Sequence, residues 1–393
     1  MIRTPVTADL LRGALEVEQT DHGVLPHRLP AWARAQLPDP SLLLAEGQPA
    51  GVRLAFRTAA TVVELEALPG KRVYAGAPLR PDGTYELVID GEVVGGGSID
   101  SGDVLLVDLM TGRAERTDGE PGRVRWDGLP PGVKDVEIWL PHDETSRPIS
   151  LHTDAPVEPA PPSGRRTWVH HGSSISHGSA AERPTGTWAA HASRLAGVDL
   201  VNLGFAGSAL VDQCVARTIR DLPADLVSVK LGINVANHDV MRMRAFTSAV
   251  HGFLDTIRDG HPETPLVVVS PIWCGIHEDT PGPAAPDMGA WAAGEVRFVA
   301  VGDPDEVPAG KLTLRTIRAE LARIVEQRAD PHLRYLDGLT LYGAEDAVRL
   351  PLPDDLHPDA TTHRLIGERF ASAVLSGLVT TSPAGGSSAA ARH

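Results

Sequence analysis

The chain has 393 residues, of which 42% are hydrophobic, and a formal net charge of −15 at pH 7. This size predicts two domains or one large domain with a substantial core. The acidic balance argues against nucleic acid as a partner, because phosphate binding needs a basic surface. No apolar stretch is long enough to span a bilayer and the first residues lack an apolar signal core, so we expect a cytoplasmic protein without a membrane partner. The two cysteines, Cys214 and Cys274, form neither a disulfide framework nor a paired metal motif.

Residues 1–155 are predicted to form an antiparallel β-sandwich of the jelly-roll kind, with residues 1–50 assigned only loosely. Three runs are typical of strands: Gly51–Phe56, Thr84–Ile89 and Val136–Leu140. The first two alternate apolar and polar residues, as half-buried strands do. Asp90-Gly91 follows the second run and precedes another apolar run, which indicates a two-residue hairpin turn.

A Pro-rich connector at 156–165 leads into a second domain at 166–378. Five strand candidates occur there: Thr167–His171, Leu200–Leu203, Leu226–Leu231, Leu266–Ser270 and Arg334–Leu336. Helical patterns lie between and after them, notably at Val240–Arg258, Leu312–Arg328 and Thr361–Ser376. The alternation predicts an α/β domain with a parallel sheet and helices on both faces. The segment 273–310 is too long for an ordinary loop, and residues 379–393 are expected to be disordered.

Polar or small residues follow four of these strands, at the edge where open α/β sheets bind ligands. Ser174 follows the first strand, Gly207 the second and Asn234 the third, while Asp354 and His357 precede the final helix. Taken singly, they have ordinary explanations as a helix cap, a turn glycine, an N-cap, a solvated carboxylate and a surface histidine. Together they supply the hydroxyl, N–H donors, carboxylate and imidazole that acyl transfer requires.

From about Arg165 to Leu375 the chain resembles the SGNH hydrolases, also called the GDSL-like esterases and lipases. The family's blocks are matched, in chain order, by Gly172-Ser173-Ser174, Gly207, Gly232-Ile233-Asn234 and Asp354-Asp355-Leu356-His357. Two positions depart from the family pattern: Ser173 replaces the Asp of the Gly-Asp-Ser block, and Val235 replaces the Asp that usually follows the Asn. The first of these Asp residues is not the nucleophile, so its loss leaves the chemistry in place.

The resemblance implies a three-layer, flavodoxin-like catalytic domain and assigns a role to each matched residue. Ser174 would be the nucleophile, His357 its base, and Asp354 the carboxylate that orients the imidazole. The N–H groups of Ser174 and Gly207 and the side-chain amide of Asn234 would form the oxyanion hole. Asp355 competes with Asp354, but the family spacing places the carboxylate three residues before the histidine.

Three histidines, His170, His171 and His177, crowd the nucleophile segment and raise the alternative of a metal site. His170 and His171 are adjacent in a strand and must point to opposite faces, and no further ligand pattern supports a metal. The phosphate-binding loop and dinucleotide motifs are also absent from the sequence. We therefore expect neither a metal nor a cofactor.

The family acts on acyl and acetyl esters, and a β-sandwich ahead of such a domain is similar to the two-domain acetyl-carbohydrate esterases. The resemblance therefore favours a serine esterase for small acyl or acetyl esters, including those of a carbohydrate or glycoconjugate. An acyltransferase with the same triad and a non-catalytic carbohydrate-binding protein are the alternatives. Trp273, Trp291 and Trp188 are the candidates to line the substrate pocket. The alternative for each is a core position, which the helical pattern around Trp188 favours for that residue.

Overall fold

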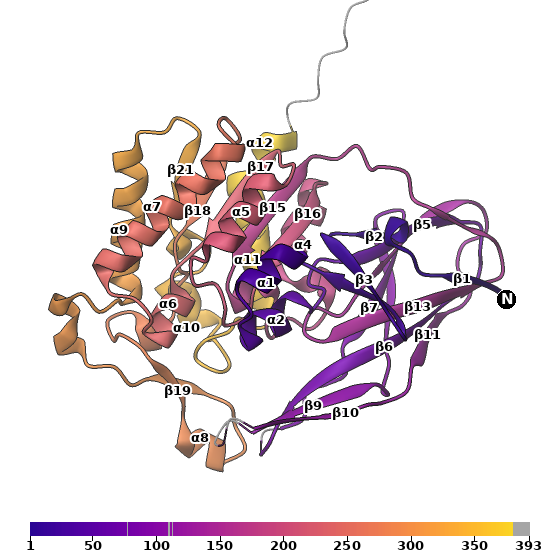
Figure 1. The fold of residues 1–393 in the computed structure, drawn as a ribbon, viewed down its shortest axis with the longest axis horizontal. Helices are drawn as coiled ribbons and strands as arrows, with labels where there is room; N and C mark the ends of the chain where they lie inside the picture. The colour runs from indigo at the N-terminus through magenta and orange to yellow at the C-terminus, as the bar shows by residue number, and fades with distance from the viewer. Residues whose placement is uncertain (77, 109–110, 112, 380–393) are drawn as a thin grey trace, which may run out of the picture.

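The computed structural model describes residues 1–76, 78–108, 111 and 113–379. A β-sandwich, in indigo and purple, lies beside an α/β domain in magenta to yellow (Figure 1). The predicted disordered tail lies outside the described residues except for Val379, which ends a short helix. In the described part of the chain, no helix is both long and apolar enough to cross a membrane.

The sandwich consists of two six-stranded sheets. The first contains β1 (Ile2–Pro5), β6 (Val63–Tyr74), β9 (Asp103–Val107), β10 (Ala114–Thr117), β11 (Gly122–Trp126) and β13 (Thr145–Thr153). The second contains β2 (Leu11–Arg12), β5 (Arg53–Thr58), β7 (Thr84–Ile89), β8 (Glu92–Ser98), β12 (Lys134–Trp139) and β14 (Val157–Pro159). All pairs are antiparallel except β6 and β9, which run parallel.

Two local features of the sandwich follow from the sequence. Asp90 and Gly91 have φ of 48° and 88° and join β7 to β8, which is the backbone that a tight hairpin turn needs. β14 lies within the Pro-rich segment 156–165 and pairs with β5. The first part of that segment is therefore an edge strand of the sandwich and not only a connector.

The N-terminal segment packs partly on the α/β domain. After a 3-10 turn at Ala8–Leu10 it forms the hairpin β3 (Glu16–Thr20) and β4 (Gly23–His27), then α1 (Ala31–Gln36) and α2 (Pro40–Glu46). Leu29, Ala33, Leu42 and Ala45 are buried in the same cluster as Phe205 of the α/β domain. The first fifty residues thus connect the two halves of the protein.

The α/β domain has a five-stranded, fully parallel sheet in the order β16-β15-β17-β18-β21. Its strands are β15 (Thr167–Gly172), β16 (Asp199–Gly204), β17 (Leu226–Lys230), β18 (Leu266–Val269) and β21 (Leu333–Leu336). Its helices are α3 (Ser174–His177), α4 (Trp188–Ala196), α5 (Gln213–Asp221), α6 (Ile233–His238), α7 (Met243–Gly260), α9 (Leu314–Arg328), α10 (Ala344–Arg349), α11 (Ala360–Phe370) and α12 (Ser376–Val379). Short 3-10 turns lie at Pro184–Gly186 and Gly338–Thr340, and a π-helical segment at Ala371–Leu375 joins α11 to α12.

Helices cover both faces of this sheet, so the predicted three-layer architecture is confirmed. On one face Val169 of β15 packs with α5, α7 and α9. On the other face Trp168 of β15 packs with α4 and α11. The strand order is that of a flavodoxin-like sheet, whose carboxyl edge is the place for a ligand site.

The long insertion after β18 is ordered and bridges the two domains. It contains 3-10 turns at Gly275–His277 and Pro304–Ala309, the hairpin β19 (Ala284–Pro286) and β20 (Phe298–Ala300), and α8 (Met288–Ala292). α8 reaches toward the lower edge of the sandwich (Figure 1). The Nε1 atom of Trp291 lies 3.7 Å from the point that a side chain on Gly76, after β6, would occupy.

Candidate active site

Ser174 lies where β15 turns into α3. Gly172 ends the strand, and a Cβ there would lie only 2.3 Å from Ser176 Oγ, so the turn accepts no larger residue. Gly178, with φ of 114°, ends the helix after four residues. Because Ser174 is the first residue of α3, its N–H has no acceptor within the helix and is available to a substrate oxygen.

Asp354, His357 and Ser174 form a hydrogen-bonded chain. The Nδ1–H of His357 donates to Asp354 Oδ2 at 2.7 Å, and the Ser174 hydroxyl donates to His357 Nε2 at 3.0 Å. The tautomer is inferred from these partners. The arrangement is that of a serine nucleophile, a base and an orienting carboxylate.

Backbone contacts fix the carboxylate. Asp354 Oδ1 accepts the N–H groups of Leu356 at 3.0 Å and His357 at 2.6 Å. Burial alone would raise the pKa of Asp354, but the hydrogen bonds and the charge of His357 outweigh it and hold that pKa below its usual range. The carboxylate is therefore ionised at neutral pH and can stabilise an imidazolium.

Asp355 points elsewhere. Its carboxylate is 44% exposed and lies 3.6 Å from Arg297 Nη1 in an ion pair. Its backbone adopts a φ of 65°, which turns the chain between Asp354 and Leu356. Of the two neighbouring carboxylates, the structure brings only Asp354 to His357.

The three expected oxyanion donors follow β15, β16 and β17, three neighbouring strands whose carboxyl ends share one edge. Asn234 Oδ1 accepts the N–H of Ala209 at 3.1 Å, and its Nδ2, which can only donate, has no acceptor in the part of the chain that the structure describes. Gly207 has a φ of 71°, and its carbonyl accepts His238 Nε2 at 2.9 Å. Within the described residues the Gly207 N–H has no acceptor.

The sequence did not predict a role for Phe298 of the insertion. Its ring meets the His357 imidazole edge-on, with centroids 6.0 Å apart and planes at 77°. Its N–H donates to the Asp354 carbonyl at 3.1 Å. The insertion therefore borders the triad, as its position after β18 suggests, but no motif marks Phe298.

The three tryptophans occupy different places. Trp188 is fully buried between Trp168, His170 and Phe370, so the prediction that it lines the pocket is wrong and the core alternative holds. Trp273 is partly buried against the same core cluster, and Trp291 lies at the contact with Gly76. Trp188 lies on the apolar face of α4, and this face packs against the sheet, as the helical pattern in the sequence indicates.

The histidines near Ser174 are structural hydrogen-bonding groups. His170 bonds Ser228 and Ser176 on one face of the sheet, while His171 donates to the Leu203 carbonyl on the other. Burial lowers the pKa of His170 well below its usual value and that of His171 to about 4, so both are neutral. Among the described residues, no three potential ligands are grouped as a metal site requires.

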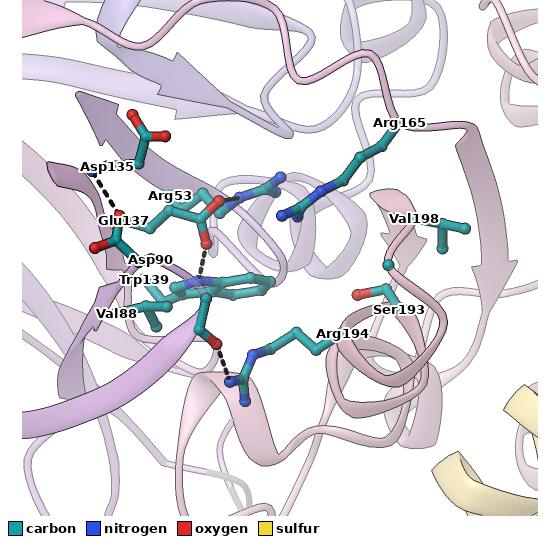
Figure 2. Close-up of a pocket in the computed structure, with 12 residues that line it drawn as sticks. Arg53, Val88, Asp90, Asp135, Glu137, Trp139, Arg165, Ser193, Arg194 and Val198 are labelled. Carbon is teal, nitrogen blue, oxygen red and sulfur yellow. Dashed lines mark hydrogen bonds and ion pairs between the residues drawn. The ribbon is translucent and has the colours of Figure 1, made fainter. Parts of the chain in front are cut away.

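A separate cavity of about 340 Å³ lies between the sandwich and the C-terminal end of α4 (Figure 2). It opens at the amino ends of the parallel strands, on the edge opposite Ser174. Arg53 bonds Glu137 at 3.0 Å and Asp199 at 2.9 Å, and Arg194 donates to the Gly91 carbonyl at 3.0 Å. These contacts tie the two domains together, and none of the triad residues lines the cavity.

A comparison with protein families matches the first part of the α/β domain. The GDSL-like Lipase/Acylhydrolase family model matches residues 165–274, which include Ser174, Gly207 and Asn234. Over residues 165–274 the chain is therefore similar to the GDSL-like lipases and acylhydrolases. The resemblance predicted from the sequence is thereby confirmed, while Asp354 and His357 lie beyond the matched range. No curated protein sequence matches the chain.

Solved structures with this two-domain architecture extend the comparison over the whole chain. A salicylyl-acyltransferase, SsfX3, from a tetracycline biosynthetic pathway is 27% identical with a TM-score of 0.77, covering 97% of this chain and 99% of that one. A GDSL-like lipase from Bacteroides ovatus is 18% identical, with a TM-score of 0.69 and coverage of 96% and 98%. A family two carbohydrate esterase from Clostridium thermocellum, solved with cellohexaose, is 13% identical, with a TM-score of 0.57 and coverage of 84% and 93%.

Proposed function

We propose that this GDSL-like protein is a serine esterase that hydrolyses small acyl or acetyl esters through an acyl-enzyme on Ser174. The observation that carries the proposal is the 3.0 Å contact between Ser174 Oγ and His357 Nε2, with Asp354 2.7 Å from the other ring nitrogen. A serine hydroxyl is a poor nucleophile unless such a base takes its proton.

The reaction follows from these positions. Ser174 Oγ attacks the ester carbonyl while His357 Nε2 takes the hydroxyl proton, and the ionised Asp354 stabilises the imidazolium. The carbonyl oxygen, now an oxyanion, accepts the N–H groups of Ser174 and Gly207 and the Nδ2 of Asn234. His357 then gives its proton to the leaving alcohol, and the acyl group remains on Ser174.

A second half-reaction releases the acid. Water enters in place of the alcohol, His357 takes one of its protons, and the resulting hydroxyl attacks the acyl-enzyme. Collapse of the second tetrahedral intermediate breaks the Ser174 ester bond, and His357 returns the proton to Ser174 Oγ. The free acid leaves, and the half-reaction has consumed one water molecule.

An acyltransferase is the second candidate, and a specific observation favours it. The solved structure that is 27% identical over almost the full length of both chains is a salicylyl-acyltransferase. The acyl-enzyme would be the same, but an alcohol would replace water in the second half-reaction. The insertion, whose Phe298 contacts His357, would then help to exclude water from the site.

The test is turnover of p-nitrophenyl acetate and of longer p-nitrophenyl esters, with a rapid-mixing measurement of the first turnover. We expect a burst of p-nitrophenol equal to the enzyme concentration, and no burst in Ser174→Ala. The ratio of free acid to transferred acyl group, measured with added alcohols and sugars, separates hydrolase from transferase. A wild type without turnover on any of these esters would favour the non-catalytic carbohydrate-binding alternative.

A further inference from the structure

The imidazole of His177, three residues after Ser174, lies between the sandwich and the turn that carries Gly207. The side chain is almost fully buried, with 1% of its surface exposed. Its Nδ1 accepts the N–H of Ala206 at 3.2 Å, and its Nε2–H donates to the carbonyl of His142 at 2.6 Å. A backbone N–H can only donate and a carbonyl can only accept, so both contacts require the neutral ring with its proton on Nε2.

The Ala206 N–H belongs to the peptide directly before the one that presents the Gly207 N–H. The turn around them is closed by the N–H of Ser208, which donates to the Phe205 carbonyl at 3.1 Å. The Phe205 N–H donates to the Gly172 carbonyl at 2.8 Å and the Ala206 N–H to His177, whereas the Gly207 N–H has no acceptor within the described residues. The orientation of the proposed oxyanion donor therefore depends on the acceptor that His177 supplies.

Arg28 holds the other side of the same turn. Its guanidinium is fully buried and donates to the carbonyls of Asn202 at 3.1 Å and Gly204 at 2.6 Å, at the end of β16. It also lies over the Phe205 ring, 5.1 Å from the centroid, and its Nη2 approaches His177 Nδ1 at 3.4 Å. The N-terminal segment thus fixes the strand from which the turn departs.

Burial, above all, keeps the His177 ring unprotonated. Together with the nearby charges of Arg28, His142 and Arg72 it outweighs the hydrogen bond to the His142 carbonyl, which raises the pKa of His177, and holds that pKa well below its usual value. A protonated ring would donate from Nδ1 and lose the bond from Ala206. The acceptor on which the turn depends is therefore preserved at neutral pH.

We propose that His177 is a positioning residue for the oxyanion hole, through which the His142 carbonyl of the sandwich holds the Ala206–Gly207 turn in place. This inference rests on the proposed function of Ser174, and it gives the sandwich a role in the reaction that requires no carbohydrate binding. His177 acts through the backbone of Ala206 and Gly207 and does not touch the reacting atoms.

Two conservative variants separate the two hydrogen bonds of the ring. In His177→Asn the amide oxygen can take the place of Nδ1 and accept from Ala206, whereas the contact with His142 is lost. In His177→Gln the amide nitrogen can take the place of Nε2 and donate to His142, whereas the acceptor for Ala206 is lost. We expect kcat to fall about 10–100-fold in His177→Gln with little change in KM, and by less than about 3-fold in His177→Asn.

His261 supplies a matched control. It is also buried, with 5% exposed, and its Nε2 donates to the Ile219 carbonyl at 2.8 Å, away from the triad. His261→Gln and His261→Asn should lower the unfolding temperature without lowering kcat. If the two His177 variants behave like this control, or lose kcat equally, then His177 has only a packing role and the proposal is wrong.

Hydrogen exchange of the backbone amides keeps this test independent of turnover. We expect the amide of Ala206 to exchange faster in His177→Gln than in the wild type, and to stay protected in His177→Asn. Absence of turnover in the wild type would refute the proposed esterase function, and the exchange rates alone would then decide the role of His177. Equal protection of Ala206 in both variants would overturn the positioning role.

Discussion

Replacement of Asn234 tests the oxyanion hole at the donor whose orientation the structure fixes best. Asn234 is 2% exposed, and its Oδ1 accepts the Ala209 N–H at 3.1 Å, so Nδ2 is the group left to donate. Loss of one oxyanion donor lowers kcat by about 10²–10³, which corresponds to roughly 3–4 kcal/mol. Asn234→Ala also leaves the buried Ala209 N–H without its partner, which costs about 1–3 kcal/mol of stability.

Asn234→Asp separates the donor from the acceptor. The aspartate retains an oxygen for Ala209, but when ionised it has no hydrogen to donate and places a negative charge beside the developing oxyanion. Two like charges about 4 Å apart repel by about 4 kcal/mol at the effective dielectric of protein sites. We therefore expect kcat to fall in Asn234→Asp by at least as much as in Asn234→Ala.

The assay is steady-state hydrolysis of p-nitrophenyl acetate, with urea unfolding of each variant measured in parallel. Thr218→Ala is a suitable control, because the buried Thr218 hydroxyl bonds the Cys214 carbonyl within α5 and its loss should affect stability but not kcat. If Asn234→Asp keeps wild-type kcat, Asn234 serves only to hold Ala209, and the oxyanion assignment is refuted.

Three further changes test other parts of the account. Asp354→Asn should lower kcat by about 10³–10⁴, because the amide favours the wrong imidazole tautomer, whereas Asp355→Asn should remain near wild type. Burial lowers the pKa of His171 and of His363 to about 4, so the unfolded chain binds protons that the folded chain excludes. Each neutral histidine therefore contributes its full share to the free energy of unfolding above pH 6.5, and this share, up to about 3 kcal/mol, is lost as the pH drops toward 4. A midpoint of urea unfolding that stays constant over this interval would contradict the reasoning. Trp188→Ala should cost about 3–5 kcal/mol in urea unfolding, and a smaller loss accompanied by a large change in KM would instead place Trp188 at the substrate.

The sequence predicted the α/β domain well, because strand ends in a parallel sheet are marked by local signals. Ser174, Gly207 and Asn234 each follow an apolar run, and in the structure these runs are the adjacent strands β15, β16 and β17. The family resemblance, which places the carboxylate three residues before the histidine, also implied the hydrogen bond between Asp354 and His357. In these cases residues that are near one another, or near a strand, in the sequence are also near in space.

Contacts between distant segments could not be predicted in this way. Phe298 reaches His357 from an insertion without periodicity, and Arg28 reaches β16 from a segment that sequence patterns assign only loosely. The sequence marks His177 only as one of three histidines near Ser174, because its partners Ala206 and His142 are set by tertiary packing. A sequence motif therefore identifies the residues proposed to act on substrate, whereas the residues that position them become visible only in the structure.

The most direct test of the central claim is covalent labelling with an organophosphonate ester of p-nitrophenol, followed by peptide mass spectrometry. Such a reagent reacts with a serine that a neighbouring base activates, and it imitates the tetrahedral intermediate. We expect one label per wild-type chain, located on Ser174, with none in Ser174→Ala and a greatly slowed reaction in His357→Ala. An unlabelled wild type, or equal labelling of Ser174→Ala, would contradict the claim.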